Sequence, residues 1–156
     1  MKQIVDRKLV GGRQFVVHRQ RKNVDGAVPD IDDDALWMAH MMCLLTTQQR
    51  SGPDSPINVL LETQPFPLSL IACRTFDDVQ SRVFEILSDA SGIRRTNNIA
   101  KAVAENLAQL EQGEWDTLRH WRDKLLAQRN LSPDLSHRHL EEEASSYMEQ
   151  FKQFGP

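Results

Sequence analysis

A long apolar segment that ends in a polar corner most constrains what this chain can fold into. Residues 36–43 read Leu-Trp-Met-Ala-His-Met-Met-Cys, and their spacing predicts a buried or nearly buried helix from about residue 33 to residue 49. Five polar residues, 46–50, follow the apolar run, and Gly52-Pro53 then breaks the chain. Ser55-Pro56 predicts the next helix, because serine is a favoured N-cap and proline suits the first helical position.

The rest of the chain also carries helical patterns. Apolar residues recur at helical spacing in residues 79–87 and 99–110, whereas the alternation typical of strands is confined at most to residues 15–18. A helix that begins at Thr75 is expected to end at Gly92, and the one after it at Gly113. Further helices are expected at residues 56–62, 68–74, 114–128 and from 136 onward. We therefore predict an all-α fold: a single globular helical domain of about six or seven helices.

Composition is ordinary for a globular protein, with 156 residues, 40% hydrophobic and 26% charged. No segment approaches the roughly 18 uncharged apolar residues of a membrane span, and the N-terminus carries no apolar signal segment. A cytoplasmic location is therefore expected. Cys43 and Cys73 lie in apolar runs and are expected to be reduced core thiols. The sequence contains no zinc ligand set, phosphate-binding glycine loop or nucleophile elbow, so we predict no metal and no cofactor.

Charge divides the chain into a basic arm, residues 1–24, and a helical domain, residues 25–156. The arm contains seven basic residues against Asp6 alone, a balance of +6. Because the whole chain carries −3, the remainder carries about −9. An acidic body with a basic arm permits local contact with phosphates but not a broad basic face.

Two segments suit contact with nucleic acid. At the corner, two adjacent glutamines and an arginine can hydrogen-bond to phosphates or base edges, although a polar helix end facing water has the same pattern. Residues 94–98, Arg-Arg-Thr-Asn-Asn, precede a predicted helix. Backbone amides at a helix start can hold a phosphate beside two arginines, but arginines are equally common on a plain surface.

Three segments resemble one known family. Residues 44–53 read Leu-Leu-Thr-Thr-Gln-Gln-Arg-Ser-Gly-Pro. They resemble the first conserved corner of the helix-hairpin-helix (HhH-GPD) DNA glycosylase superfamily, closest to a bacterial 8-oxoguanine-glycosylase-like branch. Residues 92–101 are similar to the family's glycine, basic pair and helix start, and residues 151–156 resemble the beginning of its DNA-binding hairpin. The resemblance implies base-excision repair and contact with duplex DNA through Thr47, Gln48, Gln49, Arg50, Ser51, Arg94, Arg95 and Asn97.

The resemblance stops before the family's catalytic residues. In that family the hairpin backbone grips a phosphate, a lysine beyond it attacks the sugar in bifunctional members, and a later aspartate supports the transition state. All of these lie downstream of the position that matches Pro156. We therefore expect a DNA glycosylase-like domain that is truncated before the hairpin, with no assigned catalytic residue. Gln153 also stands where the family usually has a glycine, and we expect a side chain there either to crowd the approach to a phosphate or to demand a costly backbone conformation.

An alternative interpretation is a protein-interaction module. In the full family a second lobe should cover part of the last helix, and its loss should expose Tyr147, Phe151 and Phe154. Exposed apolar patches mark interfaces, so this alternative predicts a homodimer formed through the C-terminal helix.

Overall fold

The structure, a computed structural model, describes residues 31–47, 54–131 and 138–154. The chain divides into two units, residues 1–30 and 31–156, and the description below concerns the second. The predicted basic arm and the strand-like alternation at residues 15–18 lie outside the described residues.

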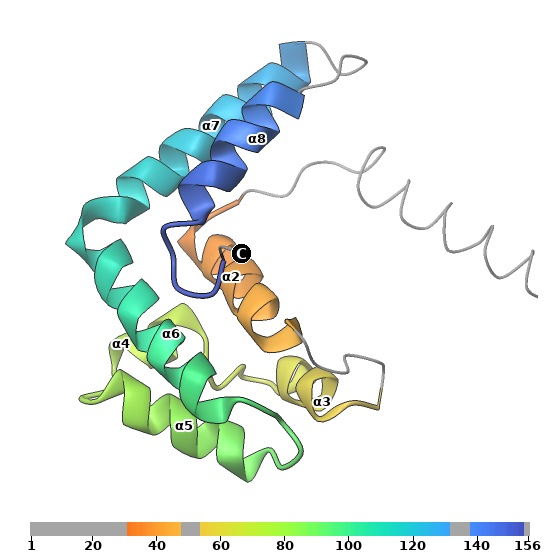
Figure 1. The fold of residues 1–156 in the computed structure, drawn as a ribbon, viewed down its shortest axis with the longest axis vertical. Coiled ribbons are helices and arrows are strands. Elements are labelled where there is room, and N and C mark those ends of the chain that lie inside the picture. The colour runs from red at the N-terminus through yellow and green to blue at the C-terminus, as the bar shows by residue number, and fades with distance from the viewer. Residues whose placement is uncertain (1–30, 48–53, 132–137, 155–156) are drawn as a thin grey trace, which may run out of the picture. The chain divides into compact units, whose positions relative to one another are not determined.

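The described residues form an all-α domain with seven α-helices and one π-helical turn, and they contain no strand. Figure 1 shows the arrangement of these elements. In chain order they are α2 (Asp33–Thr46), α3 (Pro56–Glu62), α4 (Leu70–Arg74), α5 (Val79–Asp89), α6 (Thr96–Gln109), η2 (Leu110–Glu114), α7 (Trp115–Leu131) and α8 (Arg138–Met148). The predicted all-α class is therefore confirmed.

Side-chain caps decide where the first four helices begin. Asp32, Ser55, Ser69 and Asp78 each accept a hydrogen bond from the backbone amide three residues further on. The predicted start at Ser55-Pro56 is confirmed. The predicted start of α5 at Thr75 is wrong, because Asp78 caps that helix and the Thr75 hydroxyl donates to the carbonyl of Ala72 in α4. Likewise α4 begins at Leu70, two residues later than expected, because Ser69 caps it.

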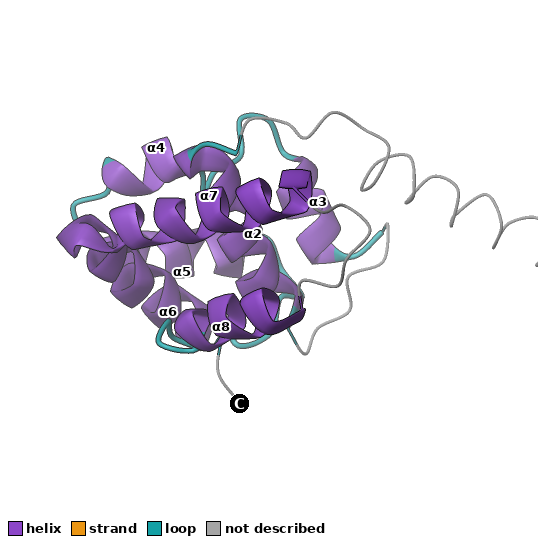
Figure 2. Cartoon of the chain, turned by 90° about the horizontal axis from the view of Figure 1, so that it is seen from above, coloured by secondary structure: helices purple, strands orange, loops and turns teal. Residues whose placement is uncertain are grey.

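Helix α2 supplies the centre of the core and contacts α3, α4 and α6. Trp37, Met41, Leu44 and Leu45 are all buried. The indole N–H of Trp37 donates to the carbonyl oxygen of Leu68 at 2.9 Å, so this large buried side chain leaves no donor unsatisfied. Helices α5 and α6 lie side by side, as Figure 2 shows from above. Their buried faces, Val83, Leu87, Ile99, Val103 and Leu107, follow the predicted stripes.

A sharp turn after α6 begins the helical hairpin of α7 and α8. Gly113 ends the α6 segment with φ 123°, which confirms its predicted role as a helix breaker. Trp115 is buried, but Trp121 is only half-buried and packs against Tyr147 of α8 with 6.2 Å between ring centroids. Arg119 ties this hairpin to the start of α2 with two hydrogen bonds to Asp33, of 2.9 and 2.6 Å. Those bonds hold the pKa of Asp33 below its usual value.

The segment after α8 turns back toward α2, so the expectation that Phe151 is exposed is wrong. Phe151 is 1% exposed, and Tyr147 and Phe154 are partly buried against the core. The Phe151 ring makes edge-on contacts with His40 and Tyr147. The Tyr147 hydroxyl donates to Glu114 at 2.7 Å. None of the described helices is long and apolar enough to span a membrane.

Gly92 provides a test of the loop between α5 and α6. Its φ is +87°, and a Cβ there would lie 3.0 Å from Cγ of Pro56. We expect Gly92→Ala to lower the free energy of unfolding in urea by about 1–2 kcal/mol, because the left-handed conformation is strained for L-residues. Gly92→Asn adds the same Cβ, but asparagine tolerates this conformation better, so its loss should be smaller. Equal losses in the two variants would contradict the left-handed backbone as the cause.

Candidate nucleic-acid interface

Only the first residue of the predicted corner lies in the described part of the chain. Thr47 is the C-cap of α2 with φ −63° and ψ 122°, so the helix ends earlier than the predicted residue 49. The Thr47 hydroxyl donates to the carbonyl of Cys43 at 2.6 Å, which gives it a capping role. Gln48, Gln49, Arg50 and Ser51 lie outside the described residues, and their DNA contact stays a prediction.

The second predicted segment lies at the start of α6, and Arg94, Arg95 and Asn97 are all exposed there. Arg95 occupies the N-cap position in the left-handed conformation, with φ 60° and ψ 27°. No side chain caps α6, whereas α2, α3, α4 and α5 each have a capping side chain. Of the helices α2 to α6, α6 is therefore the one whose N-cap residue makes no side-chain capping bond, and the N-terminus of a helix is a favourable place for an anion.

Residues 151–156, the third family-like segment, contact residues 92–101, the second, through the side chain of Gln153. The Gln153 Nε2 donates to the carbonyl of Asn98 at 3.0 Å, and Arg95 Nη2 donates to Gln153 Oε1 at 3.2 Å. Gln153 itself has φ 68°, so of the two expected consequences of a side chain at this position, the structure shows the costly backbone conformation. The structure thus joins two of the three segments, which are 55 residues apart at the Gln153–Asn98 bond.

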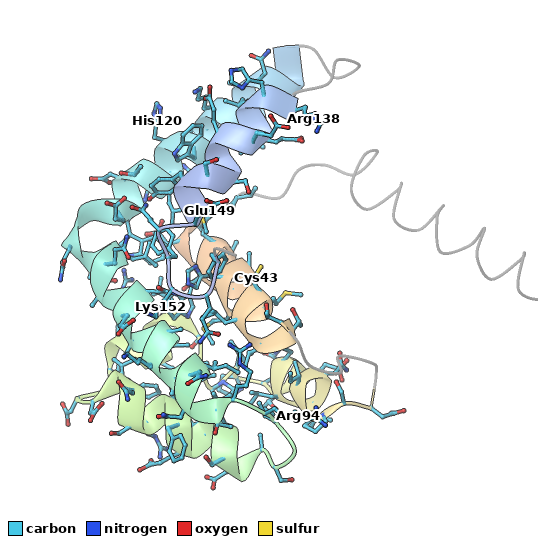
Figure 3. The ribbon with its side chains drawn as sticks, viewed as in Figure 1. Cys43, Arg94, His120, Arg138, Glu149 and Lys152 are labelled. Carbon is cyan, nitrogen blue, oxygen red and sulfur yellow. The ribbon has the colours of Figure 1, made fainter. Side chains whose placement is uncertain are left out.

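Lysines extend this basic surface along α6. Lys101 Nζ lies 3.7 Å from Glu105 Oε1, and Lys152 Nζ lies 3.9 Å from Glu105 Oε2. Figure 3 shows Lys152 on the C-terminal turn (residues 149–154) beside α6, and Arg94 at the loop that precedes this helix. All three paired side chains are about half exposed, and exposed pairs of this kind contribute little to stability. Arg95 bonds to Gln153, and Lys101 and Lys152 both lie near Glu105, so these three cations are on adjoining parts of α6 and the C-terminal turn. Arg94 is exposed and directly precedes Arg95 in the chain.

A buried amide holds the C-terminal turn beneath this surface. Asn106 is wholly buried, its Oδ1 accepts from the Lys152 amide at 2.7 Å, and its Nδ2 donates to the Lys152 carbonyl at 3.1 Å. The same Nδ2 lies 2.9 Å from His40 Nε2. Since the two backbone bonds fix which end of the amide donates, His40 Nε2 must be the acceptor and must carry no proton. Asn106 therefore lies fully within the core, with all the polar atoms of its side chain hydrogen-bonded.

His40 is a residue that the sequence pattern did not single out. It is 4% exposed, stacks on Trp37 with 5.6 Å between ring centroids, and lies 4.4 Å from the Phe154 ring centroid. Burial lowers the pKa of His40 to about 4. The ring is therefore neutral near pH 7. A polar residue inside the apolar run 36–43 was the only available signal, and it resembles an ordinary core histidine.

The described residues offer no metal centre, since they contain no group of three or more histidine, cysteine or acidic side chains that could hold an ion. Cys73 is buried as predicted, and burial raises the pKa of its thiol to about 12. The core location predicted for Cys43 is wrong, because the core face of α2 is formed by its neighbours Met41, Leu44 and Leu45. Figure 3 shows the Cys43 side chain at the outer side of α2.

Comparison with family models, curated proteins and solved structures finds no match to this chain. Its function must therefore be inferred from the residues and contacts described above.

Substitutions of Gln153 test its contact between the C-terminal turn and the start of α6. Gln153→Ala removes both side-chain hydrogen bonds and keeps a strained left-handed backbone, whereas Gln153→Gly removes the bonds and relieves the strain. We expect the glycine variant to be more stable than the alanine variant by about 1 kcal/mol in urea unfolding. A more stable alanine variant would show that residue 153 does not adopt the left-handed conformation.

Proposed function

We propose that this chain is a DNA glycosylase-like helical domain that contacts the backbone of duplex DNA through the start of α6 and the C-terminal turn. The observation that carries the proposal is the Gln153 junction. It links Arg95 and Asn98 of one family-like segment to another, and Gln153 has a left-handed backbone at the position where the family has glycine. The resemblance alone did not require these two segments to meet.

The chemistry of the α6 start supports phosphate as the contacted group. The N-terminus of a helix carries partial positive charge, and its first amides point outward to bind an anion. Arg94 and Arg95 add two guanidinium groups, which match the geometry of phosphate oxygens. Phosphate contacts position a protein on DNA without reading its sequence, so we expect little sequence preference from this surface.

The limited number of cations sets the expected affinity. With about three or four phosphate contacts, the logarithm of the binding constant should fall with the logarithm of salt concentration with a slope of about −3. The net charge of −3 on the chain opposes DNA binding at longer range, so the affinity should be weak at physiological salt.

We do not propose homodimerisation through the C-terminal helix. Phe151, one of its three proposed apolar contacts, is buried in the core of its own chain, and Tyr147 and Phe154 are partly buried. No observation within the described residues favours that interface over DNA contact.

The first test changes two cations at the proposed contact. The double variant Arg94→Gln, Lys101→Gln should bind a fluorescent DNA duplex about threefold to tenfold more weakly than the unmodified chain at low salt. Its salt slope should be less steep by about 2, because two phosphate contacts are lost. Fluorescence anisotropy measured over a salt series reports both quantities.

A matched control removes the same charge elsewhere. Lys124→Gln, Arg138→Gln lies on the α7–α8 hairpin, where each cation pairs with an exposed glutamate. The control should bind DNA with nearly unchanged affinity and salt slope. If both double variants lose affinity equally, the binding reflects net charge alone and the proposed contact is wrong.

The second test concerns catalysis. We assign no residue of this chain to attack on the sugar, so the purified chain should form no adduct with 8-oxoguanine or abasic duplex under borohydride. Borohydride traps the imine that an enzyme amine forms with the sugar, and a bifunctional glycosylase is the positive control. A trapped adduct would show that an amine of this chain is a nucleophile and would overturn the assignment.

A further inference from the structure

Several contacts hold the C-terminal turn to the rest of the domain. Gln153 bonds to Asn98 and Arg95 at the start of α6, and Lys152 Nζ lies 3.9 Å from Glu105 Oε2. The contacts on the buried side of the turn are those with Asn106 and His40. Asn106 makes two hydrogen bonds to the backbone of Lys152. Phe151 and Phe154 pack against the His40 ring, with centroid distances of 5.5 and 4.4 Å. Backbone bonds between residues of the turn, such as the one from the Phe154 N–H to the Phe151 carbonyl, are local and do not attach the turn to α2 or α6.

His40 lies at the centre of these contacts in an uncharged environment. The groups against its ring are Trp37 on its own helix, Asn106 on α6, and the two phenylalanines of the turn. The charged side chains near this part of α6 and the turn include Lys101, Glu105 and Lys152, which pair with one another and are about half exposed. Burial is the cause of the lowered pKa of His40.

We propose that the C-terminal turn is an acid-sensitive latch, which is closed on neutral His40 and opens when His40 takes up a proton from solvent. Protonation turns Nε2 from an acceptor into a donor that faces another donor, Asn106 Nδ2, across 2.9 Å. Asn106 can accept from the protonated ring only by reversing its amide, and this breaks both of its bonds to Lys152. The buried charge also has no carboxylate among the described contacts of the ring, so opening the turn is its route to water.

The direction of the pH effect follows from the pKa of His40. In the closed state the pKa is about 4, below the value of 6.5 for an accessible histidine. The open state therefore binds the proton more tightly, and the closed state is fully favoured above about pH 6.5. As the pH falls from about 6.5 to about 4, the ratio of open to closed turn should rise about tenfold per pH unit.

The proposal can be tested on the whole chain by nuclear magnetic resonance without DNA, so its outcome is independent of the proposed function. Hydrogen exchange of the Lys152 amide, corrected for its intrinsic rate, reports opening of the turn. Amides of Leu44 in α2 and Leu107 in α6 report opening of the core. Protection of Lys152 should fall between pH 6.5 and 4 before that of the two core amides. Simultaneous loss at all three sites, or unchanged protection at Lys152, would overturn the latch.

Two variants isolate the histidine responsible. His40→Gln keeps an acceptor for Asn106 but does not titrate, so its Lys152 protection should be independent of pH in this range. His139→Gln removes an exposed histidine and should behave like the unmodified chain. Persistence of the pH effect in His40→Gln would overturn the proposal. If that variant does not fold, the unmodified chain decides: the fall in Lys152 protection must begin near pH 6.5 and must level off below the midpoint of the His40 ring titration, and any other pH range would overturn the proposal.

Discussion

The arrangement of the candidate interface depends on one buried amide. Asn106 satisfies every polar atom of its side chain inside the core, through the backbone of Lys152 and the ring of His40. A buried amide with all its partners present defines one geometry, and the loss of any partner leaves an unsatisfied group that costs about 1–3 kcal/mol. Asn106 therefore holds the C-terminal turn and the ring of His40 against the C-terminal half of α6, while Gln153 joins the turn to the start of that helix.

Local signals in the sequence predicted the helices well and their starts less well. Apolar spacing identified α5 and α6, and Gly113 was correctly placed as a break in the helical backbone. Gly92 is left-handed as expected, but it lies in the loop, because α5 already ends at Asp89. The start of α5 was misplaced because Thr75 and Asp78 are both acceptable caps, and only the tertiary structure shows that Thr75 closes the preceding helix. The exposure of Cys43 was likewise not predicted, because the apolar run of α2 has no clear amphipathic periodicity that would show which face is exposed.

The candidate site was predictable only in pieces. Sequence reasoning found the basic pair before α6 and the unusual residue at position 153, but it gave no reason for them to meet. Their contact depends on the fold of α7 and α8, which returns the chain to α6, and no local pattern encodes such a long-range approach. His40 was missed because a buried histidine is recognised by its partners, and those partners come from α6 and the C-terminal turn.

The bonds between Asn106 and Lys152 also affect which substitutions the chain can tolerate. Asn106 contacts only the main-chain N–H and carbonyl of residue 152, so these two bonds make no demand on the side chain there. Every amino acid except proline supplies both groups. Position 152 is thus open to change in charge and size while the turn keeps its place, whereas position 106 requires a side chain that donates and accepts at once. The fold therefore allows many residue types at position 152 on the surface of the turn and few at position 106, which anchors it.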